Sequence, residues 1–110
     1  MLIKLLEDES SWARSVINNF NKSSLKEERE ASATVLCRLI QRGNKWAKGR
    51  VDHFSLTTKD TYKDVAVMTL VKLLQQKKEW GVSKIDRWIE SDRVKEREIA
   101  EEARTLSKTL

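Results

Sequence analysis

The feature that most constrains the fold is an unusually apolar run over residues 62–74. From residue 65 onward, only Thr69 and Lys72 interrupt it. A helix on the surface of a domain carries a single apolar stripe, so this run is too apolar on all sides to lie there. It is also shorter than the roughly 20 apolar residues that a membrane span requires. The run therefore predicts the innermost helix of a compact bundle, over about residues 59–80.

The remaining composition favours helix throughout the chain. Its 110 residues include no proline and only three glycines, the two residue types that interrupt helices most strongly. The apolar residues are clustered and recur at helical spacing, which a disordered chain lacks. A chain of this length buries roughly two thirds of its unfolded surface, enough for a core without disulfides. We therefore expect one all-α domain over residues 1–110, a compact bundle of four to five helices around the central helix.

Two segments before the central helix also show helical patterns. Residues 2–20 carry an interrupted apolar stripe, which fits either one helix or a short turn followed by a helix from Ser11. The next helix is predicted to start at a capping box formed by Ser24 and Glu27. In that motif the serine hydroxyl accepts a hydrogen bond from a free backbone amide, and the glutamate bonds back to the serine amide.

The end of this second helix can be placed in two ways. A left-handed cap at Gly43 would end it there, whereas without that cap it would continue to Gly49. Residues 50–58 lack a helical period and predict a connecting loop. Thr57 or Thr58, at the end of that loop, would then cap the central helix through its hydroxyl.

The last third of the chain predicts a turn and a charged helical region. Gly81 would end the central helix, and the next helix would begin at Ser83. Farther on, four apolar residues recur at heptad-like spacing: Ile99, Ala103, Leu106 and Leu110. A helix this rich in charge is weak alone and needs a partner surface. It could fold back on the central helix or pair with its own copy.

Positive charge is concentrated in residues 38–50, a segment without acids. Its five cationic residues equal the net charge of +5 of the whole chain: Arg38, Arg42, Lys45, Lys48 and Arg50. Cationic side chains neutralise phosphates and an aromatic ring such as Trp46 can stack on a base, so the segment suits contacts to nucleic acid. In the competing interpretation Trp46 is a core residue, and Arg38 and Arg42 only offset the partial negative charge at the C-terminal end of a helix.

A second basic group surrounds the predicted turn at Gly81. It consists of Lys77, Lys78, Lys84 and Arg87. Two helices joined by such a turn could form a helix–turn–helix, with residues 84–90 entering the DNA groove. However, Lys77 stands where that motif has a small residue, and Arg87 and Glu90 stand where it has apolar ones. An ordinary turn between two bundle helices is the stronger interpretation.

Reactive residues offer little for catalysis. One cysteine, Cys37, and one histidine, His53, cannot build the usual Cys/His zinc site. They could form a nucleophile–base pair, but a buried thiol in a helix and a histidine in a loop explain them more simply. Acidic pairs one turn apart, such as Asp60 with Asp64, are explained by the helix dipole. We therefore expect a non-enzymatic protein without catalytic residues, metal or cofactor.

The leading hypothesis is a small basic module that binds DNA or RNA. The residues expected to contact nucleic acid are Arg38, Arg42, Lys45, Trp46, Lys48, Arg50, Lys77, Lys78, Lys84 and Arg87. The alternative is a protein-interaction or assembly module that uses exposed tryptophans and the C-terminal helix over residues 93–110, with a protein partner or as a homodimer. The start of the chain lacks the apolar core of a signal peptide and a single cysteine fits a reducing compartment, so we expect a cytoplasmic or nuclear protein without membrane contact.

Overall fold

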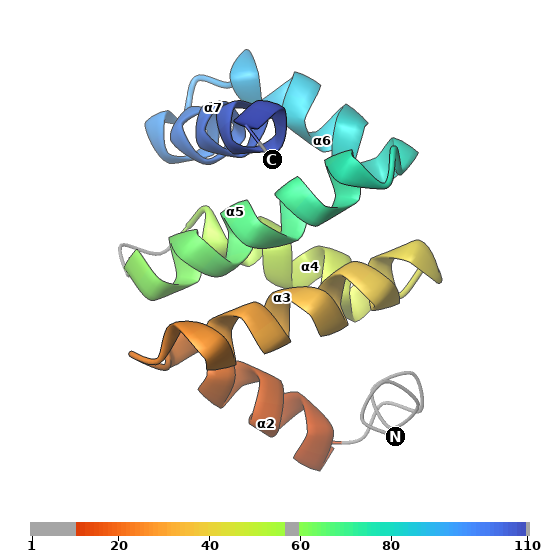
Figure 1. Ribbon diagram of the computed structural model, residues 1–110, viewed down its shortest axis with the longest axis vertical. Helices are drawn as coiled ribbons and strands as arrows, with labels where there is room; N and C mark the ends of the chain where they lie inside the picture. Colours follow the sequence, from red (N-terminus) through yellow and green to blue (C-terminus); the bar gives the residue numbers. More distant parts are fainter. Residues whose placement is uncertain (1–10, 57–59, 110) are drawn as a thin grey trace.

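A computed structural model describes residues 11–56 and 60–109, and all regular structure in these ranges is α-helical (Figure 1). The helices are α2 (Ser11–Lys22), α3 (Lys26–Gln41), α4 (Lys45–Phe54), α5 (Asp60–Gln75), α6 (Glu79–Ile89) and α7 (Val94–Thr109). The expected all-α class is confirmed. The described part of the chain contains six helices instead of the four to five predicted, because the segment before the central helix, expected to be largely a loop, forms α4.

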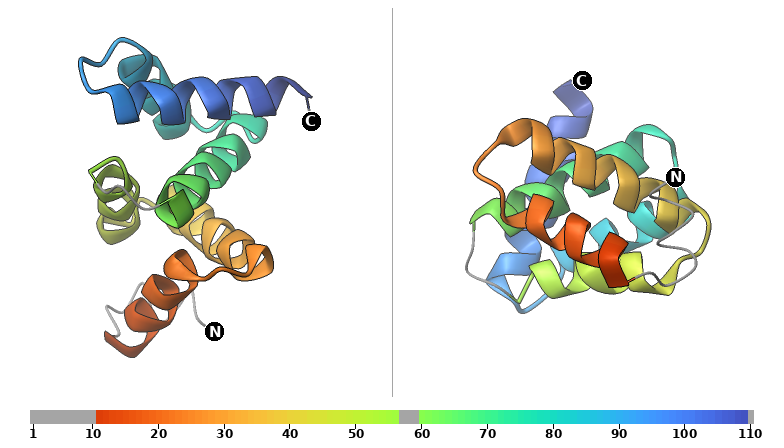
Figure 2. Two further views of the ribbon diagram at one scale, coloured as in Figure 1. Left: turned by 90° about the vertical axis from the view of Figure 1, so that its left-hand side faces the viewer. Right: turned by 90° about the horizontal axis from the view of Figure 1, so that it is seen from below.

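Helix α5 is the centre of the bundle and contacts each of the other five described helices. Its side chains Val65, Ala66, Leu70 and Leu73 are completely buried. Figure 1 shows α3 and α7 on opposite sides of α5, with α2 beyond α3, and Figure 2 shows α4 closing one flank of this stack. The apolar run over residues 62–74 is therefore the innermost helix, as its composition predicts, because each of its faces meets another helix.

The capping box predicted at Ser24 and Glu27 is wrong. Helix α3 begins at Lys26, and its N-cap, Leu25, makes no side-chain capping bond. The hydroxyl of Ser23 takes this place instead: it accepts from the backbone N–H of Leu25 at 3.0 Å and hydrogen-bonds the carboxylate of Glu28. Ser23 and Glu28 are five residues apart, not the three of a capping box, so this contact belongs to the turn before α3 and the motif did not indicate it.

The left-handed cap predicted at the end of α3 is confirmed. Gly43 has a φ of 78°. The N–H of Asn44 donates to the Leu39 carbonyl at 2.9 Å, and the N–H of Gly43 donates to the Ile40 carbonyl at 2.9 Å. These two bonds form a Schellman motif, which satisfies carbonyls that the end of a helix leaves without partners.

The loop predicted over residues 50–58 is wrong over its first half, because α4 extends to Phe54. The side-chain oxygen of Asn44 accepts from the backbone N–H of Ala47 at 3.0 Å and caps the start of the helix. Ala47, Val51 and Phe54 are fully buried and follow a spacing of four and three residues. Gly49 and the charged residues between them hid this short stripe. The proposed caps at residues 57 and 58 lie outside the described residues.

The predicted central helix ends at Gln75 and does not reach residue 80. Lys77 adopts the left-handed conformation with a φ of 56°, where glycine is the usual residue. The N–H of Lys78 donates to the Leu73 carbonyl at 2.9 Å, completing a second Schellman motif. Because a lysine occupies the left-handed position, no glycine or asparagine marks this turn in the sequence.

Helix α6 begins at Glu79 and includes both Gly81 and Ser83, so the predicted turn at Gly81 and the helix start at Ser83 are wrong. A helix–turn–helix with its turn at Gly81 is therefore absent. Gly81 instead permits close packing: a Cβ added there would lie 2.5 Å from the Cβ of Leu73. Its role is to let α6 approach the end of α5.

The C-terminal helix folds back on the bundle. Helix α7 packs against α5 and α6, and its residues Ile99, Ala100 and Ala103 are completely buried. Leu106 stays partly exposed, and residue 110 lies outside the described ranges. No helix within these ranges has the length and apolar character needed to cross a membrane.

The two helical glycines provide a matched test of the packing of α6 on α5. We expect Gly81→Ala to lower the free energy of unfolding by about 1–3 kcal/mol, because the new methyl group overlaps Leu73. Gly49→Ala meets no atom within 4 Å in α4, so it should raise stability by about 0.5–1 kcal/mol. Urea unfolding followed by circular dichroism measures both. Equal effects of the two substitutions would contradict the close approach.

Candidate nucleic-acid interface

The structure brings three basic segments to one end of the bundle. Helix α3 ends, α4 begins and α5 ends there, at the right-hand side of Figure 1. The side-chain amide of Gln41, at the end of α3, donates to the side-chain oxygen of Gln76, just after α5. We call this region the basic end, and its cations are Arg38, Arg42, Lys45, Lys48, Lys72, Lys77 and Lys78. Six of these seven residues were predicted to contact nucleic acid.

Lys72 is the member of the basic end that sequence reasoning missed. It was noted only as an interruption of the apolar run over residues 62–74. Its side chain is half-buried. Its positive charge, like those of the exposed Arg38 and Lys78, acts to lower the pKa of the Cys37 thiol. A lysine inside a buried helix must reach the surface between neighbouring helices. That expectation, together with the absence of acidic residues over 65–78, is the sequence signal that could have placed Lys72 in the basic surface.

Six cations of the basic end have no carboxylate partner among the residues that the structure describes. The chain has no acidic residue over 31–51 or over 65–78. Within the described ranges, no ion pair to a carboxylate involves any of Arg38, Lys45, Lys48, Lys72, Lys77 and Lys78. Elsewhere in the bundle such pairs are common, for example Arg29 with Asp64 at 2.8 Å and Lys63 with Glu98 at 3.5 Å. The net charge of the protein is therefore concentrated at this end.

Trp46 and Arg50 do not extend from the basic end into solvent. Trp46 is half-buried and packs against the core, and the guanidinium carbon of Arg14 lies 5.3 Å from its ring centroid. Arg50 is half-buried above the ring of Phe54, at 5.8 Å. The interpretation of Trp46 as a residue that closes the bundle therefore fits its environment better than base stacking.

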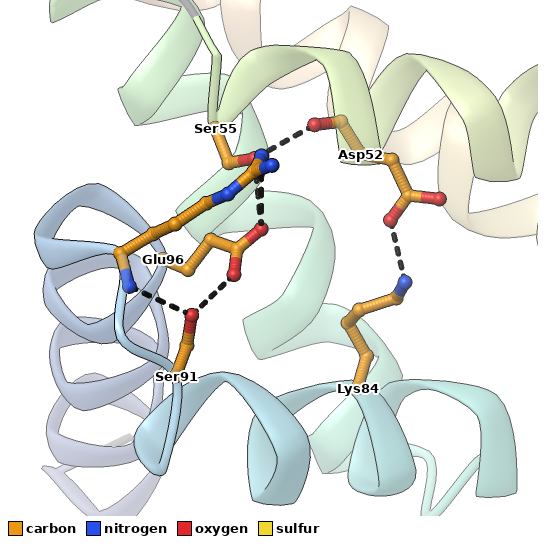
Figure 3. A network of polar contacts seen from close by, with 6 residues as sticks. Asp52, Ser55, Lys84, Ser91 and Glu96 are labelled. Atoms are coloured by element: carbon orange, nitrogen blue, oxygen red, sulfur yellow. Dashed lines mark hydrogen bonds and ion pairs between the residues drawn. The ribbon is translucent and has the colours of Figure 1, made fainter.

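Lys84 is the clearest departure from the predicted site, because it is buried, with only 7% of its surface exposed. Its ammonium nitrogen lies 2.5 Å from Oδ1 of Asp52, which joins α6 to α4 (Figure 3). The same nitrogen lies 5.1 Å from the ring centroid of Trp80 and 5.3 Å from that of Trp88. Lys84 therefore joins α6 to α4 through an ion pair, and it makes two cation–π contacts within α6. Arg87, farther along α6, is exposed, but no contact between described residues links it to the basic end.

A second polar network stabilises the junction of α4 and α7 (Figure 3). The hydroxyl of Ser91 donates to Glu96 at 2.5 Å, and the other oxygen of that carboxylate lies 3.4 Å from the hydroxyl of Ser55. The backbone N–H of Arg93 donates to Ser91 at 3.0 Å. These contacts fix the start of α7, on the side of the bundle away from the basic end.

Cys37 and His53 do not form a reactive pair within the described structure. Burial raises the pKa of the Cys37 thiol, although the positive charges of Lys72, Lys78 and Arg38 oppose the rise. The hydrogen bond of this sulfur is donated by the amide of Gln41 at 3.5 Å, while His53 is exposed on α4. A protonated thiol is a poor nucleophile. The described residues also contain no group of three or more His, Cys, Asp or Glu residues arranged to hold a metal ion.

The buried position of Lys84 can be tested by two substitutions. Lys84→Met retains the apolar length of the side chain between the two tryptophans, so we expect the free energy of unfolding to change by less than about 1.5 kcal/mol. Lys84→Ala leaves a cavity there and should destabilise the fold by about 2 kcal/mol more than Lys84→Met. Thermal or urea unfolding measures both. Equal stability of the two variants would show that the stem of Lys84 is not packed.

Comparison with known proteins places this chain in no family. No family model, no curated protein and no solved structure matches it. The function is therefore inferred from the charges and contacts of its own residues.

Proposed function

We propose that this protein binds nucleic acid, DNA or RNA, through the basic end. The observation that carries the proposal is the convergence of six cations that form no ion pair with a carboxylate of the described residues. They are Arg38 in α3, Lys45 and Lys48 in α4, Lys72 in α5, and Lys77 and Lys78 in the turn after α5. Polyanions bind such surfaces because each neutralised phosphate releases condensed counterions. If five of these cations contact phosphates, log K falls with log salt at a slope of about −4 to −5.

Helix dipoles alone do not account for this charge. Arg38 and Lys72 lie in the last turns of α3 and α5, where a cation offsets the negative end of the helix. Each helix end carries only about half an elementary charge, so these two residues suffice. Lys45 and Lys48 lie at the positive end of α4, where they add to the dipole. A surface that raises its own positive potential in this way suits an anionic partner.

The proposed contacts are to phosphates and not to base faces. Trp46 is half-buried below the guanidinium of Arg14, which leaves the basic end without a freely exposed aromatic ring among its described residues. Phosphate contacts position a protein on nucleic acid without reading its sequence. Binding should therefore tolerate many sequences and depend strongly on salt.

A charge-matched pair of triple variants tests this proposal. Lys45→Gln, Lys48→Gln and Lys77→Gln together remove three charges from the basic end. We expect weaker binding to a fluorescent DNA duplex and a salt slope that is less steep by about 2–3, measured by anisotropy between about 50 and 200 mM NaCl.

The control triple, Lys22→Gln, Arg93→Gln and Lys95→Gln, removes the same charge at the end of α2 and the start of α7. These segments lie at the opposite side of the molecule in Figure 1. The control should bind nearly as the unaltered protein does. Equal losses in both triples would mean that only net charge matters, and no binding by the unaltered protein at about 50 mM NaCl would refute the function.

A second candidate function, protein interaction, is favoured by Trp12. Its side chain is 65% exposed at the start of α2, and exposed tryptophans often anchor protein interfaces. The C-terminal stripe supports a homodimer less well, because Ile99 and Ala103 are buried inside the bundle and Leu106 alone of its described members reaches the surface.

Self-association through Trp12 can be measured directly. Under this second function, light scattering detects an assembly that persists at about 1 M NaCl, where charge contacts between surfaces are screened. Trp12→Ser should then dissociate it, whereas Leu56→Ser, at another exposed apolar residue, should not. A monomer at all salt concentrations would exclude self-association by this route.

A further inference from the structure

A polar notch opens between the last turns of α3 and α5, within the basic end. Its volume is about 330 Å³. Residues of α3 and of α5, with the turn that follows it, line the notch: Thr34, Cys37, Arg38, Gln41, Lys72, Gln75 and Gln76. We call it the α3–α5 notch. Its lining includes two cations and no carboxylate, and neither cation forms an ion pair with a described residue.

The hydrogen-bonding groups of the notch are mostly donors. Gln76 accepts through its side-chain oxygen from Gln41, which leaves its own NH₂ group available to donate. The Thr34 hydroxyl donates to the Glu30 carbonyl at 3.0 Å, so it offers only its lone pairs. Arg38 and Lys72 add a guanidinium and an ammonium group, which accept nothing. A ligand that accepts hydrogen bonds and carries negative charge therefore fits this lining.

Positive charges act on the thiol of Cys37, which is part of the lining of the notch. Burial raises the pKa of this thiol, while the positive charges of Lys72, Lys78 and Arg38 act to lower it. Lys72 of α5, Arg38 of α3 and Lys78, which follows α5, therefore each favour negative charge at this sulfur. Arg38 and Lys72, which come from two different helices, both line the notch.

Size and polarity select the kind of anion. A water molecule occupies about 30 Å³ in the liquid, so the notch has room for a phosphate group with several waters. A nucleobase would need an apolar or aromatic wall, and the lining has no aromatic residue. The walls suit tetrahedral oxyanions, which Arg and Lys bind through charge-assisted hydrogen bonds.

We propose that the α3–α5 notch binds one phosphate group between Arg38 and Lys72, with the amide of Gln76 donating to a third oxygen. The inference rests on the proposed function: when nucleic acid binds the basic end, this phosphate is a phosphodiester of its backbone. The notch then fixes the register of the strand, while Lys45, Lys48, Lys77 and Lys78 contact flanking phosphates.

Side-chain amide signals in NMR spectra test the notch directly. The NH₂ resonances of Gln41, Gln75 and Gln76 should shift on titration with a short DNA duplex. Inorganic phosphate is the second probe and should shift the same resonances at higher concentration, because it lacks the flanking contacts.

Substitutions that remove one charge each provide the binding test. Lys72→Gln and Arg38→Gln should each weaken duplex binding by about fivefold and make the salt slope less steep by about 1. Lys22→Gln is the matched control, since it removes the same charge from an exposed residue at the other end of the bundle. Thermal unfolding confirms that each variant is folded.

The outcomes separate the notch from the proposed function. One outcome is that the duplex binds, the three amide signals stay unchanged and Lys72→Gln behaves as Lys22→Gln. Phosphate binding in the notch is then wrong, whereas nucleic-acid binding by the basic end stands. If no nucleic acid binds while inorganic phosphate shifts the Gln76 signal, the function is wrong and the notch is a site for a small phosphate compound. Unchanged signals with both probes would overturn the inference.

Discussion

The burial of α5 on all sides is the constraint on which the rest of the structure depends. One neighbouring helix cannot bury a helix that carries valine, leucine and alanine on every face, because each apolar face must be removed from water. Helices α3 and α7 cover opposite sides, and α2, α4 and α6 complete the enclosure. Gly81 shows how tight this enclosure is, since even a methyl group at that position would overlap α5. The ends of the surrounding helices, where the charged residues lie, are consequently left at the surface.

The distribution of ion pairs follows from this arrangement. Acidic residues of α5, α6 and α7 form ion pairs across the bundle: Asp64 with Arg29, Asp86 with Arg104, and Glu98 and Glu102 with Lys63. Acidic residues are absent over residues 31–51 and 65–78; the first of these stretches turns from α3 into α4 at the basic end, and the second finishes there. The basic end is thus the side at which two acid-free segments meet. Its potential is a property of the assembled fold, because each segment alone carries only part of the charge.

Much of the fold could be predicted from local patterns, and the failures share one cause. The apolar run and the cap at Gly43 were recognisable because their residue types have few alternatives. Helix α4 was missed because its stripe of Ala47, Val51 and Phe54 is short and interrupted by charge. The turn after α5 was missed because Lys77 holds a backbone conformation that usually signals itself through glycine. In both cases tertiary packing overrides weak local preference.

The sequence by itself determined the helical class, the burial of residues 62–74 and the supply of uncompensated positive charge, because composition and periodicity act locally. Only the tertiary structure decided which cations remain at the surface. It buries Lys84 between Trp80 and Trp88 beside Asp52, covers Trp46 with Arg14, and places Lys72 across a notch from Arg38. The pairings of Lys84 with Asp52, Trp46 with Arg14 and Lys72 with Arg38 join residues distant in the chain, and their geometry depends on how helices cross. No periodicity within a single segment encodes that geometry.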